Sequence, residues 1–325
     1  MNYRQRILVI RLSALGDVAI LEPVLRLRAA RCPDVLFLLA APPRLEPLFR
    51  GVENIQFVPT QKRQSPRQLY AALAPLHPDM VADMHHVNRV IGLDWLFRLH
   101  GVPVRAIRKH RQPGRPSWLR YNDVLDRCGL PQVDGIHALA SSYWSPKERD
   151  GRRPAIGLAP FAQHQGKIWP LEQTERLIQL LSADGRYSLY LFGSKEEAAT
   201  LDPWAARYPH TASLAGKDGF DQELKQIAQL DLMVSMDSAN MHFASCMGVP
   251  VVSLWGATHP CRGFYGWRQN PDWAVQHPLD CRPCSKYGNK PCRLGDYPCL
   301  RAIAPEEVLD KIESILFPQP AHISE

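Results

Sequence analysis

Short apolar runs alternate with segments of helical periodicity along almost the whole chain, and this alternation restricts the available folds more than any other feature. In the first half, the apolar runs lie at 7–12, 35–40, 55–58, 80–84 and 104–107. Helical patterns follow them at 18–30, 43–49, 66–76, 90–99 and 118–128. The second half repeats the pattern, with strands at 155–159, 187–192, 231–237 and 251–254 and helices at 171–181, 195–206, 220–230 and 306–316. Such alternation predicts parallel sheets joined by right-handed crossovers.

The run from 131 to 154 is polar and interrupts the alternation. We therefore predict an α/β chain of two Rossmann-like, doubly wound domains, residues 1–145 and 146–325, facing a cleft in which ligands bind. A length of 325 residues agrees with roughly two domains. The closing helix at 306–316 is amphipathic, and whether it packs back on the first domain is left open.

Charge is unevenly divided between the halves. Residues 1–150 hold 22 Lys and Arg against 13 Asp and Glu, whereas residues 151–325 hold 17 against 19. A basic half predicts an anionic partner, such as nucleic acid, a lipid surface or a phosphorylated glycan, and a solvated basic loop is the alternative. The chain has no nucleic-acid-binding motif and no interleaved aromatic residues, which argues against nucleic acid. The densest basic stretch contains Arg105, Arg108, Lys109, Arg111, Arg115 and Arg120.

No run of 18 apolar residues occurs, so the sequence predicts no membrane-spanning helix. The N-terminal residues are polar and lead straight into the first apolar strand, without the pattern of a signal peptide. We therefore expect a cytoplasmic protein.

The segment DLMVSMDSANMHFASCMGVPVVSLWG, residues 231–256, predicts a strand, a tight turn, a helix and a second strand. Asp237 and Ser238 are good N-cap residues, and they place the turn at the carboxyl end of a parallel strand and at a helix N-terminus. Unpaired N–H groups and the helix dipole favour an anion there. Asp237, Ser238 and His242 together are more polar than a cap requires, although a capped helix with a core histidine is the alternative.

The first apolar strand ends in the turn Arg11-Leu-Ser-Ala-Leu-Gly-Asp17. Gly16 permits a tight turn, and Asp17 begins the next helical pattern. Asp17 has two interpretations: an N-cap residue, or a general base that removes a proton from an acceptor hydroxyl. The turn does not match the GxGxxG fingerprint, so it does not indicate a nicotinamide site, and it does not match the P-loop either.

Two further loops follow strands of the second half. Lys167 lies just before a helical pattern, where a lysine suits a phosphate, and a solvated loop lysine is the alternative. Gly193 turns the chain towards Glu196 and Glu197, whose carboxylates could accept hydrogen bonds from ribose or sugar hydroxyls. Acids that favour the helix dipole are the alternative, which is preferred for Glu197.

Four of the eight cysteines fall in the segment Cys281-x2-Cys284-x7-Cys292-x6-Cys299. A Cys-x2-Cys pair followed by two more thiols could bind a structural zinc ion. The last two cysteines are not a second Cys-x2-Cys pair, and this favours unligated thiols. We expect no required cofactor and no catalytic metal.

Together these segments resemble glycosyltransferase family nine, the lipopolysaccharide heptosyltransferases. The resemblance covers nearly the whole chain. It rests on ILVIRLSALGDVAILEPVL, the Lys167-Ile-Trp-Pro loop, DSANMHFASCMGVPVVSLWGATHP and the cysteine-containing tail that ends at Pro305-Glu-Glu-Val. It implies the GT-B fold and an inverting, metal-independent transfer of a sugar from a nucleotide diphosphate. It also implies that the N-terminal domain binds the acceptor and the C-terminal domain most of the donor.

The resemblance also implies roles for single residues. Asp17 would be the general base, Lys167 would neutralise the donor phosphates, and Glu196 would bind the ribose. Asp237 would hold the sugar, Ser238 and the neighbouring N–H groups would meet the pyrophosphate, and His242 would contact a phosphate oxygen. This chain has Ala239 where the family commonly has glycine, which narrows the approach to a phosphate.

We therefore predict an inverting transferase that moves a sugar, heptose from ADP-heptose, onto a lipopolysaccharide core or a similar anionic glycolipid. Arg105, Arg108, Lys109 and Arg111 are the candidate acceptor-binding residues, and the protein is expected to touch the cytoplasmic face of the inner membrane peripherally. The alternatives are a transferase for another nucleotide sugar, a sugar-nucleotide epimerase or hydrolase, and a non-catalytic module for phosphorylated glycan or anionic membrane.

Overall fold

The computed structural model describes residues 3–108, 114–148 and 150–318. The chain divides into two compact units, Met1–His137 and Ala138–Glu325. The boundary lies before the predicted one at 145 because the following residues bond to the second unit. There, Trp144 Nε1 donates to the Ser245 carbonyl at 3.0 Å, and Arg268 donates to Ser142 Oγ at 2.9 Å.

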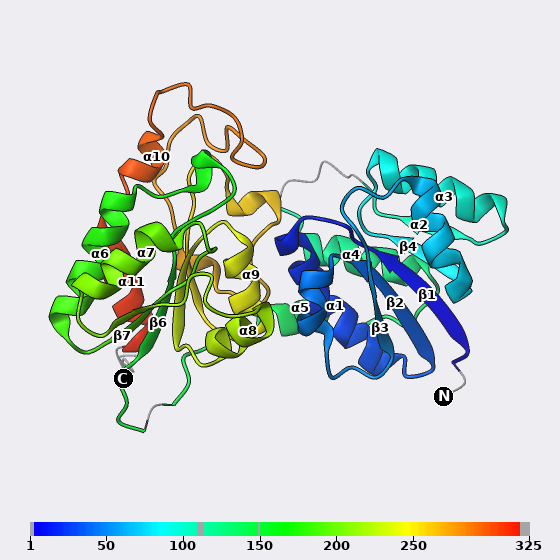
Figure 1. The fold of residues 1–325 in the computed structure, drawn as a ribbon, viewed down its shortest axis with the longest axis horizontal. Helices are drawn as coiled ribbons and strands as arrows, with labels where there is room; N and C mark the ends of the chain where they lie inside the picture. The colour runs from blue at the N-terminus through cyan, green and yellow to red at the C-terminus, as the bar shows by residue number, and fades with distance from the viewer. Residues whose placement is uncertain (1–2, 109–113, 149, 319–325) are drawn as a thin grey trace, which may run out of the picture. The chain divides into compact units, whose positions relative to one another are not determined.

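The first unit is a five-stranded parallel sheet in the order β3-β2-β1-β4-β5. Its strands are β1 (Gln5–Ile10), β2 (Val35–Ala41), β3 (Ile55–Pro59), β4 (Met80–Asp83) and β5 (Val104–Ala106). Its α-helices are α1 (Leu15–Arg31), α2 (Pro66–Leu73), α3 (Asn88–Leu99) and α4 (Ser117–Arg127), with α5 (Ile136–Ala140) at the boundary; Pro43–Phe49 and Ala74–Leu76 are 3-10 helices. The helices α1 and α4 pack together, as do α2 and α3, and the two pairs cover the sheet (Figure 1).

The second unit is a six-stranded parallel sheet in the order β11-β10-β9-β6-β7-β8. Its strands are β6 (Ala155–Ala159), β7 (Ser188–Leu191), β8 (Thr211–Ser213), β9 (Leu232–Met236), β10 (Val251–Leu254) and β11 (Ala274–Val275). Its α-helices are α6 (Leu171–Asp184), α7 (Ala198–Arg207), α8 (Phe220–Ala228), α9 (Ala239–Cys246), α10 (Pro298–Arg301) and α11 (Pro305–Leu316). Three 3-10 helices lie at Gln165–Lys167, Pro260–Arg262 and Pro271–Trp273.

The predicted fold class, two doubly wound α/β domains, is confirmed. The central strands are mostly apolar because helices cover both of their faces. Strand β9, for example, is buried at every position. The closing helix α11 packs against α6, and its buried residues Val308, Ile312 and Ile315 belong to the core of the second unit.

Each sheet reverses its strand order at one place. In the first unit the chain builds outward from β1 through β2 to β3 and then returns to add β4 on the other side of β1. In the second unit β9 is added beside β6 after β7 and β8. The carboxyl ends of the strands at such a reversal leave a crevice in which open α/β sheets bind ligands. The loops after β1 and β4, and those after β6 and β9, are therefore the places to search for a site.

Among the described residues, no helix is long and apolar enough to cross a membrane.

Candidate active site

In the first unit, an ion pair marks the reversal between β1 and β4. Arg11, directly after β1, places its guanidinium 2.5 Å from Asp17 Oδ2 and donates to the Met84 carbonyl at 2.6 Å. Asp17 lies in the first turn of α1, which begins two residues earlier than the predicted N-cap position, and its carboxylate also accepts from the Ala14 N–H at 3.3 Å. Its side chain is 20% exposed. Asp17 is thus oriented by two partners while part of its carboxylate can still meet a ligand.

His85 is the neighbour of this ion pair that the sequence analysis missed. It follows β4, and its Nε2 lies 3.2 Å from Ser13 Oγ in the turn that leads to Asp17. Burial and then the charge of Arg11 lower the pKa of His85 to about 4, so the ring is neutral at pH 7. The sequence feature that could have identified His85 is its position directly after the fourth apolar run, where the other candidate residues also follow strands.

Two buried acidic residues lie close to His85 in the fold. Asp83 ends β4, and Asp94 lies on α3. Burial and then the neighbouring carboxyl of Asp83 raise the pKa of Asp94 to about 8.

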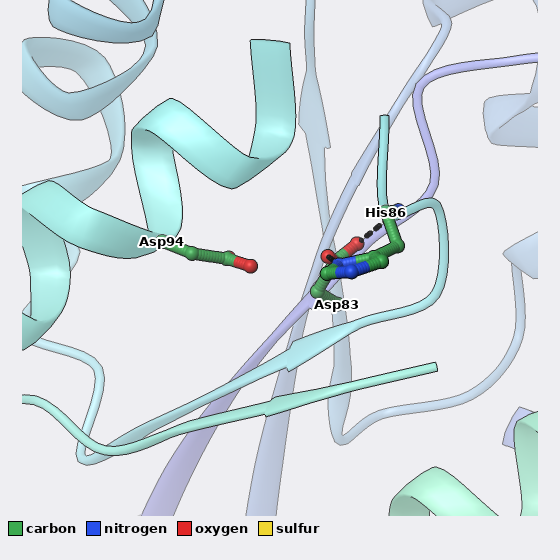
Figure 2. Close-up of side chains that lie close together, drawn as sticks. All are labelled: Asp83, His86 and Asp94. Atoms are coloured by element: carbon green, nitrogen blue, oxygen red, sulfur yellow. Dashed lines mark hydrogen bonds and ion pairs between the residues drawn. The ribbon is translucent and has the colours of Figure 1, made fainter. Parts of the chain in front are cut away.

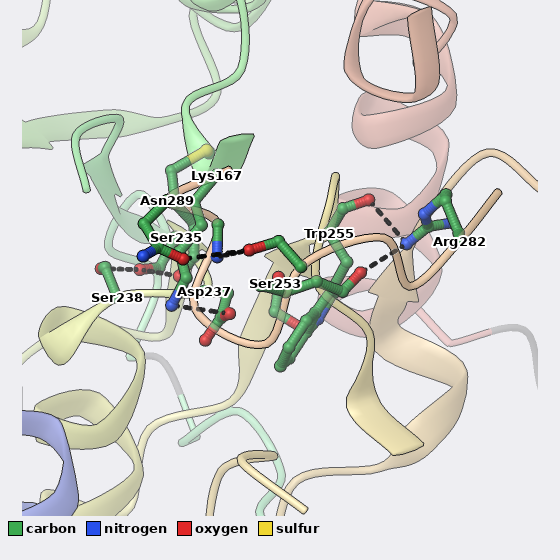
Figure 3. A network of polar contacts seen from close by, with 12 residues as sticks. Lys167, Ser235, Asp237, Ser238, Ser253, Trp255, Arg282 and Asn289 are labelled. Atoms are coloured by element: carbon green, nitrogen blue, oxygen red, sulfur yellow. Dashed lines mark hydrogen bonds and ion pairs between the residues drawn. The ribbon is translucent and has the colours of Figure 1, made fainter. Parts of the chain in front are cut away.

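In the second unit, Lys167 and Asp237 meet at the reversal between β6 and β9. Lys167 Nζ lies 2.9 Å from Asp237 Oδ2, and the side chains are 17% and 5% exposed, respectively (Figure 3). Lys167 comes from the loop after β6 and Asp237 from the turn after β9. The strand order therefore brings together two candidate residues that are 70 positions apart in the chain.

The Lys167 loop is fixed mainly by its backbone. The Gly166 N–H donates to the Gly288 carbonyl at 3.2 Å, and the Gly166 carbonyl accepts from the Ala257 N–H at 2.8 Å. A Cβ at Gly166 would lie 2.7 Å from that Gly288 oxygen, so glycine is required for this approach. On the other side of the lysine, Trp169 is buried, and its indole N–H donates to the Ile303 carbonyl at 3.2 Å.

The turn after β9 presents a helix N-terminus. Ser238 is at the N-cap position of α9, but its side chain does not cap the helix, and its Oγ lies 3.2 Å from Ser235 Oγ instead. Ala239 is the first helical residue and is half-buried. An anion could therefore approach the first N–H groups of α9. His242, one turn into the helix, is 5% exposed, which leaves little of the ring accessible to a ligand.

The two glutamates after β7 differ in their surroundings. Glu197 Oε2 accepts from the Ser194 N–H at 2.6 Å, while the Glu197 N–H donates to Ser194 Oγ at 3.4 Å. This reciprocal pair gives Glu197 a structural role at the start of α7, which differs from the helix-dipole role preferred from the sequence. Glu196 is exposed, and hydrogen bonds from its own N–H and from Ser194 lower its pKa. Its carboxylate is accessible to solvent.

Part of the basic stretch lies around a cavity in the first unit. Arg108, with Arg120 and Arg127, lines a cavity of about 280 Å³ that also contains two aspartates. Arg105 donates from Nε to the Arg127 carbonyl at 2.9 Å. The other candidate acceptor-binding residues, Lys109 and Arg111, lie outside the described residues.

The four clustered cysteines do not form a compact ligand set in the part of the chain that the structure describes. Within the described ranges, three or more potential metal ligands come within 4.8 Å of one another only at Asp83, His86 and Asp94. Cys281 is exposed, whereas Cys299 is buried in the core of the second unit, where burial raises its thiol pKa.

Comparison with known families decides the relationship. The model of glycosyltransferase family 9 (heptosyltransferase) matches residues 80–294. The chain belongs to glycosyltransferase family 9. The family match includes both the Lys167 loop and the turn at Asp237, whereas Asp17 lies before the matched region.

Named relatives of this family 9 chain are heptosyltransferases. Lipooligosaccharide heptosyltransferase 2 of Haemophilus influenzae is 31% identical over 116 residues, which are 34% of this chain and 33% of that protein. The lipopolysaccharide core heptosyltransferase OpsX of the same organism is 22% identical over 276 residues, or 78% of this chain and 80% of that one. The alignments with the first relatives thus span only about a third of their length.

Solved structures support the fold of this family 9 chain. A family 9 glycosyltransferase from Veillonella parvula superposes with a TM-score of 0.76 at 20% identity and covers 98% of each chain. The Escherichia coli heptosyltransferase WaaC, solved with ADP, gives a TM-score of 0.68 at 18% identity and covers 95% of this chain and 99% of that one. The predicted GT-B fold is therefore confirmed.

Proposed function

We propose that this chain is an inverting glycosyltransferase that moves heptose from ADP-heptose onto a lipopolysaccharide core or a similar anionic glycolipid. Membership of family 9 and the heptosyltransferase names of its relatives support the reaction class. The WaaC structure with ADP and the related WaaC structure with an ADP-heptose analogue support the donor. The expected partners are this donor, the glycolipid and the cytoplasmic face of the inner membrane, and nucleic acid is not among them.

The observation that carries the proposal is the position of Lys167 beside the N-terminus of α9. Negative charge develops on the departing nucleotide diphosphate. Lys167, His242 and the N–H groups after Ser238 would stabilise this charge in a partly buried setting. Because these groups supply positive charge and donors, the proposed transfer requires no metal ion. Asp237, which already binds the Lys167 ammonium, would accept hydrogen bonds from the sugar, and Glu196 would bind the ribose.

The first unit would supply the base. The Asp17 carboxylate removes the proton of the acceptor hydroxyl, the hydroxyl oxygen attacks the anomeric carbon, and the bond to the diphosphate breaks with inversion. Arg11 keeps the carboxylate in position through their ion pair. Arg105 and Arg108, with Lys109 and Arg111, would attract the anionic acceptor.

The test is Asp17→Asn, which keeps the size of the side chain and removes the base. We expect the turnover number to fall at least about 100-fold, the lower end for general-base catalysis. Affinity for ADP, measured by calorimetry, should change by less than about twofold, because the proposed donor residues are on the second unit. Asp34→Asn is the matched control, since Asp34 is another ion-paired aspartate of the first unit, 2.6 Å from Arg4 and exposed.

Near-normal turnover of the Asp17→Asn variant would remove Asp17 from the base role. Product analysis without acceptor tests the reaction class itself. Rapid conversion of the donor into an epimer or a free sugar in the absence of acceptor would favour an epimerase or hydrolase instead.

A further inference from the structure

Three potential metal ligands converge at the end of β4, from three different parts of the first unit. Asp83 ends the strand, His86 lies in the following loop, and Asp94 reaches in from α3. Their ligand atoms, one oxygen from each carboxylate and a ring nitrogen of the imidazole, all lie within 4.8 Å of one another. Figure 2 shows the Asp94 side chain extended from its helix towards the other two.

Asp94 is the member of this cluster that most needs a partner. Asp83 and Asp94 are 0% and 1% exposed, respectively. Among the described residues, no N–H or hydroxyl donor reaches either carboxyl oxygen of Asp94, and its polar neighbour is the Asp83 carboxyl. Two neighbouring buried carboxyl groups cannot both stay ionised: one of them holds a proton, or a cation compensates both. The buried Asp94 carboxyl, aimed at two other potential ligands, is therefore a place where a cation can take the position of that proton.

Asp83 and His86 are already arranged as ligands. The Asp83 Oδ1 atom accepts from the N–H groups of His85 and His86, both at 2.8 Å. These bonds hold the carboxylate so that Oδ2 faces His86 Nδ1 at 3.0 Å. Backbone donors that orient a ligating carboxylate are typical of metal sites. Half-buried His86 leaves a path by which an ion could enter.

We propose that Asp83, His86 and Asp94 bind one divalent transition-metal ion of the zinc class. Two carboxylate oxygens and one imidazole nitrogen are a donor set that zinc accepts at about 2.0–2.2 Å, with water completing the coordination. Asp83 Oδ2 and His86 Nδ1 already lie 3.0 Å apart, so Asp94 is the ligand that would have to move closer to the ion. The ion would tie β4 to α3 and fix the loop that carries His85. Its ligands are none of the groups proposed to act on the donor, so the site does not depend on heptosyl transfer.

The experiment uses the full chain, freed of metal by chelation and then titrated with Zn²⁺. We expect one Zn²⁺ per chain by elemental analysis and a higher melting temperature with the ion than without it. Asp94→Asn preserves shape and removes the charge, and it should weaken Zn²⁺ binding at least about tenfold, the smallest effect usual for groups around a metal. His86→Ala, at a less buried position, is the second variant and should do the same. Both variants should lose the thermal shift.

Cysteines also bind zinc, so the ligand type must be identified. Co²⁺ serves as the spectroscopic probe, because thiolate ligands add an intense charge-transfer band in the near ultraviolet. We expect a Co²⁺ spectrum without this band and no loss of binding in a Cys281→Ser/Cys284→Ser variant. Failure to bind Zn²⁺, unchanged binding in Asp94→Asn and His86→Ala, or binding that disappears with the cysteines would each overturn the proposal. An Asp94→Asn variant that gains stability while the parent binds no metal would show that a proton compensates the acids.

Discussion

At the residue scale, the proposed base and the proposed phosphate-binding lysine have the same kind of support. Each charged side chain is paired with a side chain of opposite charge. Asp17 lies 2.5 Å from Arg11, and Lys167 lies 2.9 Å from Asp237. Both pairs are largely buried, so removal of one partner leaves an uncompensated charge and costs more than the pair contributes. For Lys167 the pair also has a functional consequence, because a diphosphate would compete with Asp237 for the ammonium.

Lys167→Ala should therefore weaken ADP binding by about 1.5–3 kcal/mol, the range for hydrogen bonds to charged groups. This corresponds to about 10- to 150-fold in Kd. Calorimetric titration with ADP, without added metal, measures this loss of affinity. Titration of the parent with ADP, UDP, GDP and CMP should show that ADP binds most tightly. Lys225→Ala is the matched control, because Lys225 pairs with Asp221 at 2.7 Å on the surface of the same unit. The Lys225→Ala variant should bind ADP with the same affinity as the parent.

Equal ADP affinity in the parent and the Lys167→Ala variant would remove Lys167 from the proposed site. Selective binding of UDP or GDP would keep a transferase but replace its donor. Binding of none of these nucleotides by the folded protein would favour a non-catalytic module.

The sequence could identify residues at strand ends, but not which of them meet. Asp17, Lys167 and Asp237 were found because each stands between an apolar run and a helical pattern. Contact between Lys167 and Asp237 depends on β9 being inserted beside β6, which local patterns do not encode. Asp94 was missed for a different reason: a single acid inside a helical pattern resembles an exposed residue until packing buries it.

At the element scale, the cysteine-rich segment holds the Lys167 loop in place. Arg282 anchors this segment by donating to the carbonyls of Gly256, Trp255 and Thr258 at 2.6, 3.0 and 3.1 Å. Gly288 packs closely against the aliphatic part of the Lys167 side chain. Its φ is +76°, and a Cβ added at this position would lie 2.6 Å from Lys167 Cγ. The segment therefore positions a side chain more than a hundred residues earlier in the chain.

Gly288→Ala should displace Lys167 and weaken ADP binding about tenfold, a loss of about 1.4 kcal/mol. Gly295→Ala is the matched control, since Gly295 also has a positive φ, +98°, but a Cβ there would meet nothing within 4 Å. Both variants should lose stability from backbone strain. Only Gly288→Ala should lose affinity, as measured by calorimetry below the melting temperature of each variant. Equal affinities would mean that Gly288 does not position Lys167.

Most elements could be predicted because their apolar periodicity is strong. Among the elements missed were the short edge strands β8 and β11, of three and two residues, and the short helices α5 and α10, of five and four residues. Such elements have too few positions to show a period. The expected helix at 66–76 ends its α-helical part at Leu73 and continues as the 3-10 turn Ala74–Leu76, which contains Pro75. A proline lacks the N–H that an α-helix interior requires.

At the scale of the whole molecule, basic charge is concentrated in one unit. Residues 1–137 hold 20 Lys and Arg against 11 Asp and Glu, whereas residues 138–325 hold 19 against 21. A charge excess confined to one unit gives that unit alone a long-range attraction for anionic surfaces, and salt screens it. This division agrees with the proposed assignment of the anionic acceptor to the first unit.

The protein should therefore bind vesicles that contain phosphatidylglycerol at about 50 mM NaCl and be released at about 300 mM, since the Debye length shortens over this range. Co-sedimentation measures the bound fraction. Arg108→Gln should lower it, while Arg262→Gln, at an exposed arginine of the second unit, should leave it unchanged. A bound fraction that is insensitive to salt, or equal in the two variants, would contradict an electrostatic attachment by the first unit.

The reversal of strand order has a consequence for how such a chain can diversify. In each unit most of the candidate groups stand in the connections that follow two adjacent central strands, while the strands themselves are mostly apolar. Substitutions in those loops can change what is recognised without disturbing the packing beneath them. Selection can thus retune one unit while the other keeps its chemistry, and an engineer could exchange the loops after β6 and β9 to seek a new donor while leaving the loops after β1 and β4 intact.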